Sequence, residues 1–333
     1  MTTHKKRLAL IDQNPATTWL LERNLVRGFQ VVKFTSPEEF LRNLDEPWAA
    51  VAGDYDTLAE HDALLADPQS PLHRFPWALV TDRKPVVFLP KLEKWQIYCA
   101  IPKHTPFPTE QIVPIENLIS PMDGFGLMRY FNYTFQMYRD NIRTREEKYR
   151  AVERIINHFQ TCGYETHRLY DARLVLEEML NNAFFHAFTD EQGREKYDSQ
   201  TFTVLDPGEE IYVEFGSDAQ FAGFSVCDNQ GRLHPRHILS KLSRQVMQEG
   251  LLDDSGRGIY LSRLLTSQLI FNIHKGFRTQ VICLFYERMV NSLKPLCINY
   301  LETPPPRRSS ILELAELPDD SDEKHNPQRT IDE

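Results

Sequence analysis

Apolar residues in the first third of the chain cluster in short runs that alternate with amphipathic stretches. The runs predict buried strands at 7–12, 31–34, 48–54, 75–81 and 98–103. Between them, 17–27 has the spacing of an amphipathic helix, and Ser36 followed by Pro37 has the pattern of an N-cap and a first helical residue. Strands that alternate with helices predict an α/β fold with a doubly wound parallel sheet, whose functional residues gather at the carboxyl ends of the strands.

Four polar residues fall at those carboxyl ends. In chain order they are Asp12, Asp54, Thr81 and Lys103. This layout resembles the receiver domain of two-component response regulators. The resemblance implies that Asp54 is the phosphoacceptor and that Asp12 and Asp54 hold Mg²⁺. It also implies that Thr81 and Lys103 are switch residues and that an upstream histidine kinase is a partner.

The chain departs from the receiver pattern at two places. Gln13 stands where a second acid is usual, and the loss of one carboxylate removes charge that would hold Mg²⁺. The segment 84–96, with Pro85 and Pro90, does not have the pattern of the usual fourth helix. A degenerate receiver that serves only for protein contacts is therefore the alternative interpretation.

A second pattern lies downstream, where an amphipathic run from about 168 to 187 predicts a helix. It carries Glu178, Asn182 and His186 four residues apart, so that a carboxylate, an amide and an imidazole share one helix face. An amide oxygen can ligate a hard cation, a carboxylate can accept a proton from a hydroxyl, and an imidazole can reach phosphate. Without further support, such a row is more often a solvated polar stripe.

Three later segments supply that support. A short apolar run breaks at Asp228 and turns at Gly231, which places a carboxylate at a strand end. Gly256-Arg257-Gly258 precedes a helical pattern, where exposed backbone N–H groups and the helix dipole can cradle phosphates. The last segment, 276–284, contains Thr279 in a Gly-x-x-Thr sequence before an apolar strand.

Together these elements resemble the GHKL ATPases and, within them, the anti-sigma-factor serine kinases. The first box, Glu followed by Asn-Ala and His-Ala, is complete at Glu178, Asn182 and His186, and the match covers roughly 146–288. The resemblance implies that Glu178 is the catalytic base and that Asn182 is the Mg²⁺ ligand. It implies further cofactor-binding residues, namely His186, Asp228, Gly231, Gly256, Arg257, Gly258 and Thr279. The second box departs from the family, because Gln230 stands where a glycine is usual.

These resemblances predict a C-terminal α/β sandwich of the GHKL type that binds ATP and Mg²⁺. We expect a receiver-like domain that regulates a serine/threonine protein kinase module, whose partner is an anti-sigma-factor antagonist-like protein or a sigma factor. The alternative is a partner-switching module that binds ATP without catalysis and carries a degenerate receiver. A histidine autokinase is less favoured, because His158 lacks the acidic neighbour that such motifs carry.

The connector between the two patterns has apolar residues at three- and four-residue spacing from Leu127 to Phe159, which predicts a long helix. Its interruption at 143–148 indicates either a solvated middle or a break between a linker helix and the first helix of the ATPase-like domain. Its aromatic residues, among them Phe131 and Phe135, exceed what one packing face needs. A helical seam in a homodimer is one interpretation, and packing against the receiver is the other. The expected domains are 1–122 receiver-like, 123–147 helical linker, 148–300 GHKL-type and 301–333 a disordered acidic tail.

Composition narrows the range of partners and compartments. The 333-residue chain has a net charge of −9 and no basic stripe, which argues against nucleic-acid binding. No apolar stretch reaches membrane length, so we expect no membrane partner. The five cysteines form no Cys-x-x-Cys pair, which favours a reducing cytoplasm. Within the tail, 311–317 forms a short apolar patch.

Overall fold

The computed structural model describes residues 5–14, 19–105, 109–131, 135–247, 257–286 and 293–302. All of them belong to one compact unit, Met1–Glu302. The second unit, Thr303–Glu333, lies outside the described residues, and with it nearly all of the predicted tail and its apolar patch at 311–317.

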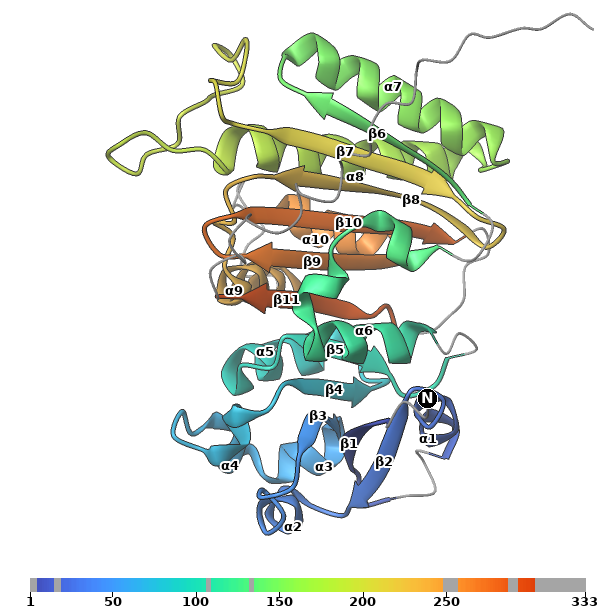
Figure 1. Cartoon of the computed structure of the whole chain (residues 1–333), viewed down its shortest axis with the longest axis vertical. Helices are drawn as coiled ribbons and strands as arrows, with labels where there is room; N and C mark the ends of the chain where they lie inside the picture. The colour runs from blue at the N-terminus through green and yellow to red at the C-terminus, as the bar shows by residue number, and fades with distance from the viewer. Residues whose placement is uncertain are drawn as a thin grey trace, which may run out of the picture. The chain divides into compact units, whose positions relative to one another are not determined.

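The strands that the structure describes form one sheet of 11 strands (Figure 1). In spatial order they are β2 (Phe29–Phe34), β1 (Lys6–Ile11), β3 (Trp48–Asp54), β4 (Trp77–Thr81), β5 (Cys99–Pro102), β11 (Leu296–Leu301), β9 (Gln268–His274), β10 (Arg278–Tyr286), β8 (Phe221–Asp228), β7 (Ile211–Ser217) and β6 (Gln136–Ile142). The first five strands are parallel to one another, and β11 joins β5 in the antiparallel direction. From β11 onward the sheet is mixed. We call the part from β1 to α6 the N-terminal half and the part from β6 to β11 the C-terminal half.

The N-terminal half is the doubly wound parallel sheet that the sequence predicts. Its strand order, β2-β1-β3-β4-β5, is one of the two common orders of such folds. Side chains alternate across the sheet, so that Leu8 and Leu10 pack in one core and Ala9 and Ile11 in the other. The helices are α1 (Trp19–Leu25), α2 (Pro37–Leu41), α3 (Tyr55–Glu60), α4 (Asp62–Ala66), α5 (Pro85–Trp95) and α6 (Thr109–Ile119). Ser36 caps α2 through its side chain, with Pro37 at the first helical position, as predicted.

Segment 84–96, which does not have the sequence pattern of the usual fourth helix, nevertheless forms helix α5. Pro85 occupies the first turn, where its missing N–H has no consequence. Pro90 lies inside the helix and removes one backbone hydrogen bond, at a typical cost of about 3 kcal/mol. Four large side chains on one face, including Phe88 and Trp95, are fully buried, and each contributes roughly 1.5–3 kcal/mol. Burial therefore outweighs the local penalty of the proline.

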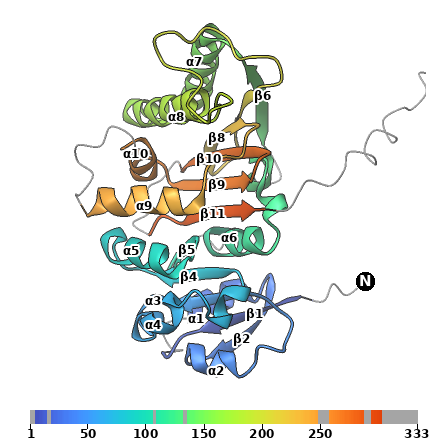
Figure 2. The ribbon, with the colours of Figure 1, turned by 90° about the vertical axis from the view of Figure 1, so that its left-hand side faces the viewer.

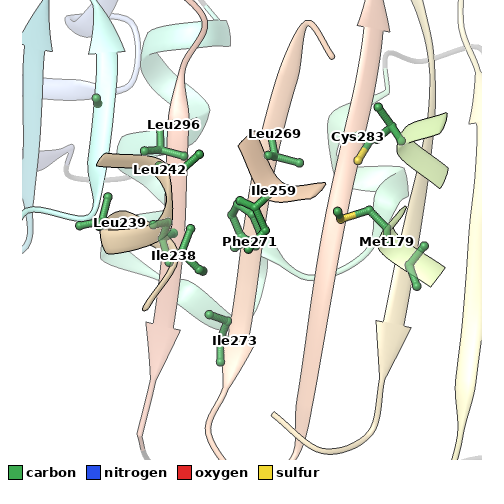
Figure 3. Packing of buried hydrophobic residues seen from close by; sticks show 14 of the residues in the cluster. Met179, Ile238, Leu239, Leu242, Ile259, Leu269, Phe271, Ile273, Cys283 and Leu296 are labelled. Atoms are coloured by element: carbon green, nitrogen blue, oxygen red, sulfur yellow. The ribbon is translucent and has the colours of Figure 1, made fainter. Parts of the chain in front are cut away.

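The C-terminal half carries its long helices on one face of the sheet (Figure 2). They are α7 (Arg145–Thr161), α8 (Thr166–His186), α9 (Pro235–Val246) and α10 (Arg257–Leu265). Figure 3 shows Met179 of α8, Leu239 of α9 and Ile259 of α10 among the apolar side chains over this face. The predicted helix at 168–187 is thus confirmed, and its polar row lies on a helix that packs against the sheet.

The helical linker predicted at 123–147 is wrong, and of the helical pattern from Leu127 to Phe159 only the part from Arg145 is a helix, so that the chain breaks within 143–148 as one of the two alternatives expected. The chain instead forms the 3₁₀ turns η3 (Pro121–Gly124) and η4 (Leu127–Tyr130), then strand β6, then α7. Strand β6 pairs with β7, and Tyr138 stacks on its cross-strand neighbour Phe215 with ring centroids 5.2 Å apart. Pairing with a distant strand thus outweighs the helical spacing of the apolar residues in this segment. A new helix starts at Thr144, whose side chain forms a capping box with Glu147.

The connector covers the second face of the C-terminal sheet (Figure 1), where η3 contacts β11 and η4 contacts β8. The Gly126 N–H donates to Gln280 Oε1 at 2.8 Å, and the Leu127 N–H donates to the buried carboxylate of Glu214 at 3.1 Å. Phe131 is only 9% exposed and stacks on Phe221. This aromatic side chain packs within the chain, but on strand β8 of the C-terminal half and not on the receiver-like half, which neither interpretation expected; the homodimer itself stays a prediction.

Among the contacts that join the halves are those of β5 and α6 with β11 and of α5 with α9. Strand β11 pairs with β5 at only two positions, Leu296 with Ala100 and Cys297 with Cys99. Helix α5 packs against α9, and the two helices lie side by side in both views (Figures 1 and 2). Arg236 at the start of α9 donates to the Gln96 side chain at the end of α5 at 2.7 Å.

Candidate functional site

A cavity of about 560 Å³ lies between α8, α9 and the strands β8, β9 and β10. We call it the α8–α9 cavity. Four of the residues predicted from the sequence line it, namely Asn182, His186, Asp228 and Thr279. They come from three elements that are far apart in the chain, so the fold brings together what the sequence shows only as separate motifs.

Asp228 ends strand β8 at the inner wall of this cavity. It is 8% exposed, and Thr279 is its direct neighbour across the β8–β10 pair. Burial raises the pKa of the Asp228 carboxyl to about 6, although hydrogen bonds from the Gln230 and Gly231 backbone N–H groups and from Thr279 lower it. A buried carboxylate with a raised pKa is suited to a ligand that donates an N–H group to it.

Gly231 fixes the turn after Asp228. Its φ of +62° is in the left-handed region, and a Cβ there would lie 1.9 Å from the His274 carbonyl oxygen. The Gly231 carbonyl accepts a hydrogen bond from the Gly276 N–H at 3.1 Å. The turn is therefore docked on the β9–β10 hairpin, and only glycine fits. The Gln230 backbone N–H donates to Asp228 Oδ1 at 2.9 Å. The glutamine at the position where the GHKL pattern has glycine therefore does not displace the Asp228 carboxylate.

The outer part of the cavity is basic. Arg232 and three residues of the α9 segment, His234, His237 and Lys241, line it. Burial lowers the pKa of both His237 and Lys241, and their mutual repulsion lowers that of His237 further. His186 pairs with the cavity residue Glu195 through Nδ1 at 2.7 Å. This wall offers several donors to an anion.

Sequence reasoning missed the α9 residues, although a signal was present. Ile238, Leu239 and Leu242 repeat at helical spacing after Pro235, and they are buried against the sheet. The polar positions of the same stretch then fall on the other helix face, toward the cavity. An amphipathic helix between the two glycine-bearing segments was thus readable from the sequence.

Glu178 does not line the α8–α9 cavity as far as the structure describes it, but it lies next to the start of α10. A Cβ on Gly258 would meet Glu178 Oε2 at 2.3 Å, so the carboxylate touches the backbone of the first turn of this helix. Arg257 is exposed at the same helix end, and Gly256 lies outside the described residues. Carboxylates are favoured near helix N-termini, where phosphate groups also bind.

Taken together, the cavity has an apolar part and a polar rim. Its apolar walls come from Met179, Val226, Ile259, Phe271 and Val281. A planar ring fits between such walls, with Asp228 as acceptor for an amino group, while an anionic group would reach the basic rim and the Asn182 amide. The described residues therefore fit a nucleotide with a hard cation on its phosphates.

The second predicted site lies at the carboxyl ends of the parallel strands. Lys103 Nζ is 2.7 Å from Asp54 Oδ1 and 3.6 Å from Asp12 Oδ2, and both carboxylates are about 5% exposed or less. Thr81 is buried at the end of β4, and its hydroxyl accepts the Arg83 N–H at 3.0 Å. Asp12 and Asp54 thus both lie beside the ammonium group of Lys103. We call the four residues Asp12, Asp54, Thr81 and Lys103 the acidic site.

The second oxygen of Asp54 has its own partners. Asp54 Oδ2 accepts the N–H groups of Asp56 and Thr57 at 3.1 and 3.2 Å and so caps helix α3. Gln13, which replaces a second acid, turns away and donates to Glu60 Oε1 at 3.0 Å. The protein itself already satisfies much of the charge of this site.

Among the described residues, no helix is long and apolar enough to cross a membrane. A comparison with models of known protein families finds no match, and a search among curated proteins also finds none.

Among solved structures, the chain is similar to the chemotaxis response regulator CheY4 of Vibrio cholerae, at 12% identity and a TM-score of 0.29, over 34% of this chain and 98% of that one. It is similar to RcsB of Salmonella enterica serovar Typhimurium bound to a promoter, at 12% identity and a TM-score of 0.26, over 36% of this chain and 68% of that one. A second structure, of the Salmonella typhimurium RcsB response regulator, matches at 10% identity and a TM-score of 0.28, over 50% of this chain and 88% of that one.

Proposed function

We propose that the C-terminal half binds ATP with Mg²⁺ in the α8–α9 cavity and that the receiver-like N-terminal half regulates it. The observation that carries this proposal is the convergence of Asp228, Asn182 and His186 on one cavity with a basic rim. A GHKL-type nucleotide site needs these groups together, and the resemblance in sequence names the same residues.

The roles follow from position. Asp228, supported by Thr279, accepts the amino group of adenine at the apolar inner wall. Asn182 supplies an amide oxygen to the cation, and the basic residues of α9 contact the phosphates. A hard cation carried by the nucleotide would neutralise charge on the phosphates.

The activity that we favour is phosphoryl transfer to a serine or threonine of a partner. Glu178 beside the start of α10 would accept the proton of the attacking hydroxyl. The partner that we propose is an anti-sigma-factor antagonist-like protein or a sigma factor, as the resemblance to anti-sigma-factor serine kinases suggests.

The first test of this proposal is Asn182→Ala. We expect Mg²⁺-dependent binding of a non-hydrolysable ATP analogue to be lost, as measured by calorimetry on the full chain. Asn181→Ala is the matched control, because its side chain accepts from Lys148 instead of lining the cavity. If the Asn182 variant binds the analogue like the parent, the proposed site is wrong.

A second candidate function is binding of ATP without catalysis. It is favoured by the position of Glu178, which lies at α10 rather than in the described cavity wall. Parent protein that binds ATP but transfers no phosphate to any candidate partner would select this function.

For regulation, we propose a route through helices α5 and α9 in place of the predicted linker helix. Helix α5 begins four residues after Thr81 of the acidic site, and it packs on α9, which supplies the basic rim of the cavity. Phosphorylation of Asp54 by a histidine kinase is the proposed input, and a degenerate acidic site that only fixes α5 is the alternative.

A further inference from the structure

Two of the five cysteines lie opposite each other where the two halves meet. In the β5–β11 pair, Cys297 is the direct neighbour of Cys99, and the two strands are adjacent in the sheet (Figure 1). Both thiols are free, and Cys99 is 0% and Cys297 2% exposed. The fold thus brings together two thiols that are about 200 positions apart in the sequence.

The hydrogen bonds between the two strands define the spacing of these cysteines. The Ile298 N–H donates to the Tyr98 carbonyl at 2.9 Å, so Tyr98 and Ile298 form a hydrogen-bonded pair of the antiparallel ladder. Such pairs alternate with non-hydrogen-bonded pairs, whose Cα atoms are about 4.5 Å apart. Cys99 and Cys297 form the next pair, which is therefore a non-hydrogen-bonded one. Disulfides span Cα distances of about 4.4–6.8 Å, so the strands already have a spacing that a disulfide can bridge.

The two cysteine side chains lie on the same face of the sheet and contact each other. Both belong to one cluster of buried side chains, whereas their neighbours Ala100 and Leu296 pack on the opposite face. A hydrogen bond with the Cys297 thiol raises the pKa of the Cys99 thiol well above its usual range, and burial raises it further. In the reduced protein, Cys99 is therefore a neutral thiol with a second thiol within hydrogen-bond distance.

A buried cation lies near this pair. Arg263 of α10 is 5% exposed and donates to the carbonyls of Lys294 and Pro295, just before β11, at 2.9 and 3.1 Å. Its guanidinium is close enough to interact electrostatically with the Cys297 thiol. A nearby guanidinium favours the thiolate, which is the form of cysteine that reacts with oxidants. We therefore expect Cys297 to react first.

The other three cysteines have no comparable partner. Cys227 and Cys283 are buried in β8 and β10, and the residues opposite them in the sheet are not cysteines. Cys162 is exposed after the end of α7, and its sulfur contacts His158 and Ser217. These three thiols therefore serve as internal controls for the pair at β5 and β11.

We propose that Cys99 and Cys297 form a redox site, at which hydrogen peroxide converts the two thiols to a disulfide that joins the halves of the protein. The Cys297 thiolate attacks one oxygen of the peroxide, the O–O bond breaks, and the other oxygen leaves as water once it is protonated. The resulting sulfenic acid reacts with the Cys99 thiol, so that an S–S bond forms and a second water leaves. The two sulfurs together lose two electrons, which reduce the peroxide.

The buried position of the thiols restricts which oxidants reach them. Strand β11 pairs with β5 at two positions but with β9 at six, and a short pairing opens at a lower free energy than a long one. A cavity of about 290 Å³ is lined by Tyr98 and Ile298, which adjoin the two cysteines in the chain. A small neutral molecule can approach through this cavity when the strands separate. We therefore expect oxidation by hydrogen peroxide that is slower than the oxidation of the exposed Cys162.

The test treats the full chain with hydrogen peroxide under native conditions, blocks the remaining thiols by alkylation and maps the disulfides by mass spectrometry. We expect the peptides of Cys99 and Cys297 to be joined, at least tenfold more often than any other pair, and to separate on addition of dithiothreitol. The linkage should persist in Cys162→Ser, which removes the exposed thiol. No linkage in the native protein, or a linkage that forms only in urea, would overturn the proposal. This readout does not involve the nucleotide site.

The variant Cys99→Ser should abolish the linkage, and Cys283→Ser is the matched control, because it also changes a fully buried cysteine. In the parent, oxidation should raise the Tm by about 5 °C, since the disulfide restricts the unfolded chain, and dithiothreitol should reverse this shift. Should Cys99→Ser not fold, the oxidised and reduced parent still decide the question. A linked parent that unfolds at the temperature of the reduced protein would show that the disulfide does not hold the halves together.

Discussion

The acidic site and the α8–α9 cavity contain similar numbers of motif residues, but they differ in how far the protein satisfies its own charges. In the acidic site, Asp54 has the Lys103 ammonium on one oxygen and the first turn of α3 on the other. In the cavity, Asp228 has backbone donors and Thr279 around it but no cationic partner at hydrogen-bond distance in the described structure, and burial raises its pKa. A carboxylate that already has an ammonium and backbone N–H groups depends less on a ligand, whereas a buried carboxylate without a cationic partner beside an open cavity is stabilised by a ligand that donates to it.

The largest effect is expected from Glu178→Gln. The glutamine keeps the size of the side chain and removes the base, so ATP binding should persist while phosphoryl transfer falls by a factor on the order of 10² or more. Glu177→Gln is the matched control, because this neighbour faces Arg173 instead of α10. Transfer from labelled ATP to a purified partner measures the effect. If phosphoryl transfer is unchanged, Glu178 is not the base, and its carboxylate beside α10 has a structural role only.

Asp228→Asn should have opposite effects on stability and on nucleotide binding. A folded-state pKa raised from 3.8 to about 6 means that protonation favours the fold; this contribution is complete below pH 3.8 and is lost as the pH rises through 6. The difference corresponds to about 3 kcal/mol at most. We therefore expect the asparagine variant to be more stable than the parent at pH 8, by thermal unfolding, and to lose affinity for the ATP analogue. Equal stability at pH 8 would show that the carboxylate is better solvated than its burial implies.

The same carboxyl predicts how binding depends on pH. If the ionised form accepts the ligand N–H, affinity should fall by up to about tenfold per pH unit below pH 6. Other titratable groups line the cavity, namely His186, Glu195, Arg232, His234, His237 and Lys241. Protonation of the histidines would favour an anion and so acts in the opposite direction. Calorimetry on the parent and on Asp228→Asn isolates the contribution of Asp228, and a pH profile that is the same in both proteins would refute it.

Local chemistry explains which parts of the structure the sequence could predict. The helix face with Asn182 and His186, the acid at Asp228 and the turn at Gly231 depend on residue type and spacing within a few positions, and the structure has them on a helix, at a strand end and in a left-handed turn. Glu178 of the same row lies beside α10 instead of in the described cavity wall. The missed features depend on distant partners. Strand β6 needs β7, some 70 residues later, and α5 needs the burial of Trp95 to tolerate its proline. No local pattern contains that information, because the stabilising surface comes from elsewhere in the chain.

A substitution that adds a carboxylate tests whether the missing acid limits Mg²⁺ binding at the acidic site. Gln13→Asp restores a second carboxylate beside Asp12 and should raise Mg²⁺ affinity on the order of tenfold, since ligand charge sets the affinity of hard-cation sites. Gln69→Asp, remote from the site, controls for the added charge. Titration with Mg²⁺, followed by reaction with beryllium fluoride, gives both the affinity and the yield of modified Asp54. No gain in either quantity would support a degenerate site that only positions α5.

The smallest effect is expected where the two regions meet. If α5 and α9 carry a signal from the acidic site to the cavity, beryllium fluoride should change the affinity for the ATP analogue, and the hydrogen bond from Arg236 to Gln96 should contribute to that change. One such bond is worth about 0.5–1.5 kcal/mol, so Arg236→Ala should reduce the response by a few fold at most. Arg244→Ala removes an arginine from the same helix without altering that bond and serves as control. Because α9 also packs on α5 through buried leucines, loss of the bond alone should weaken the coupling rather than abolish it. An affinity that beryllium fluoride leaves unchanged in the parent, with ATP still bound, would separate the two sites and leave the N-terminal half as a scaffold that holds the basic rim of the cavity.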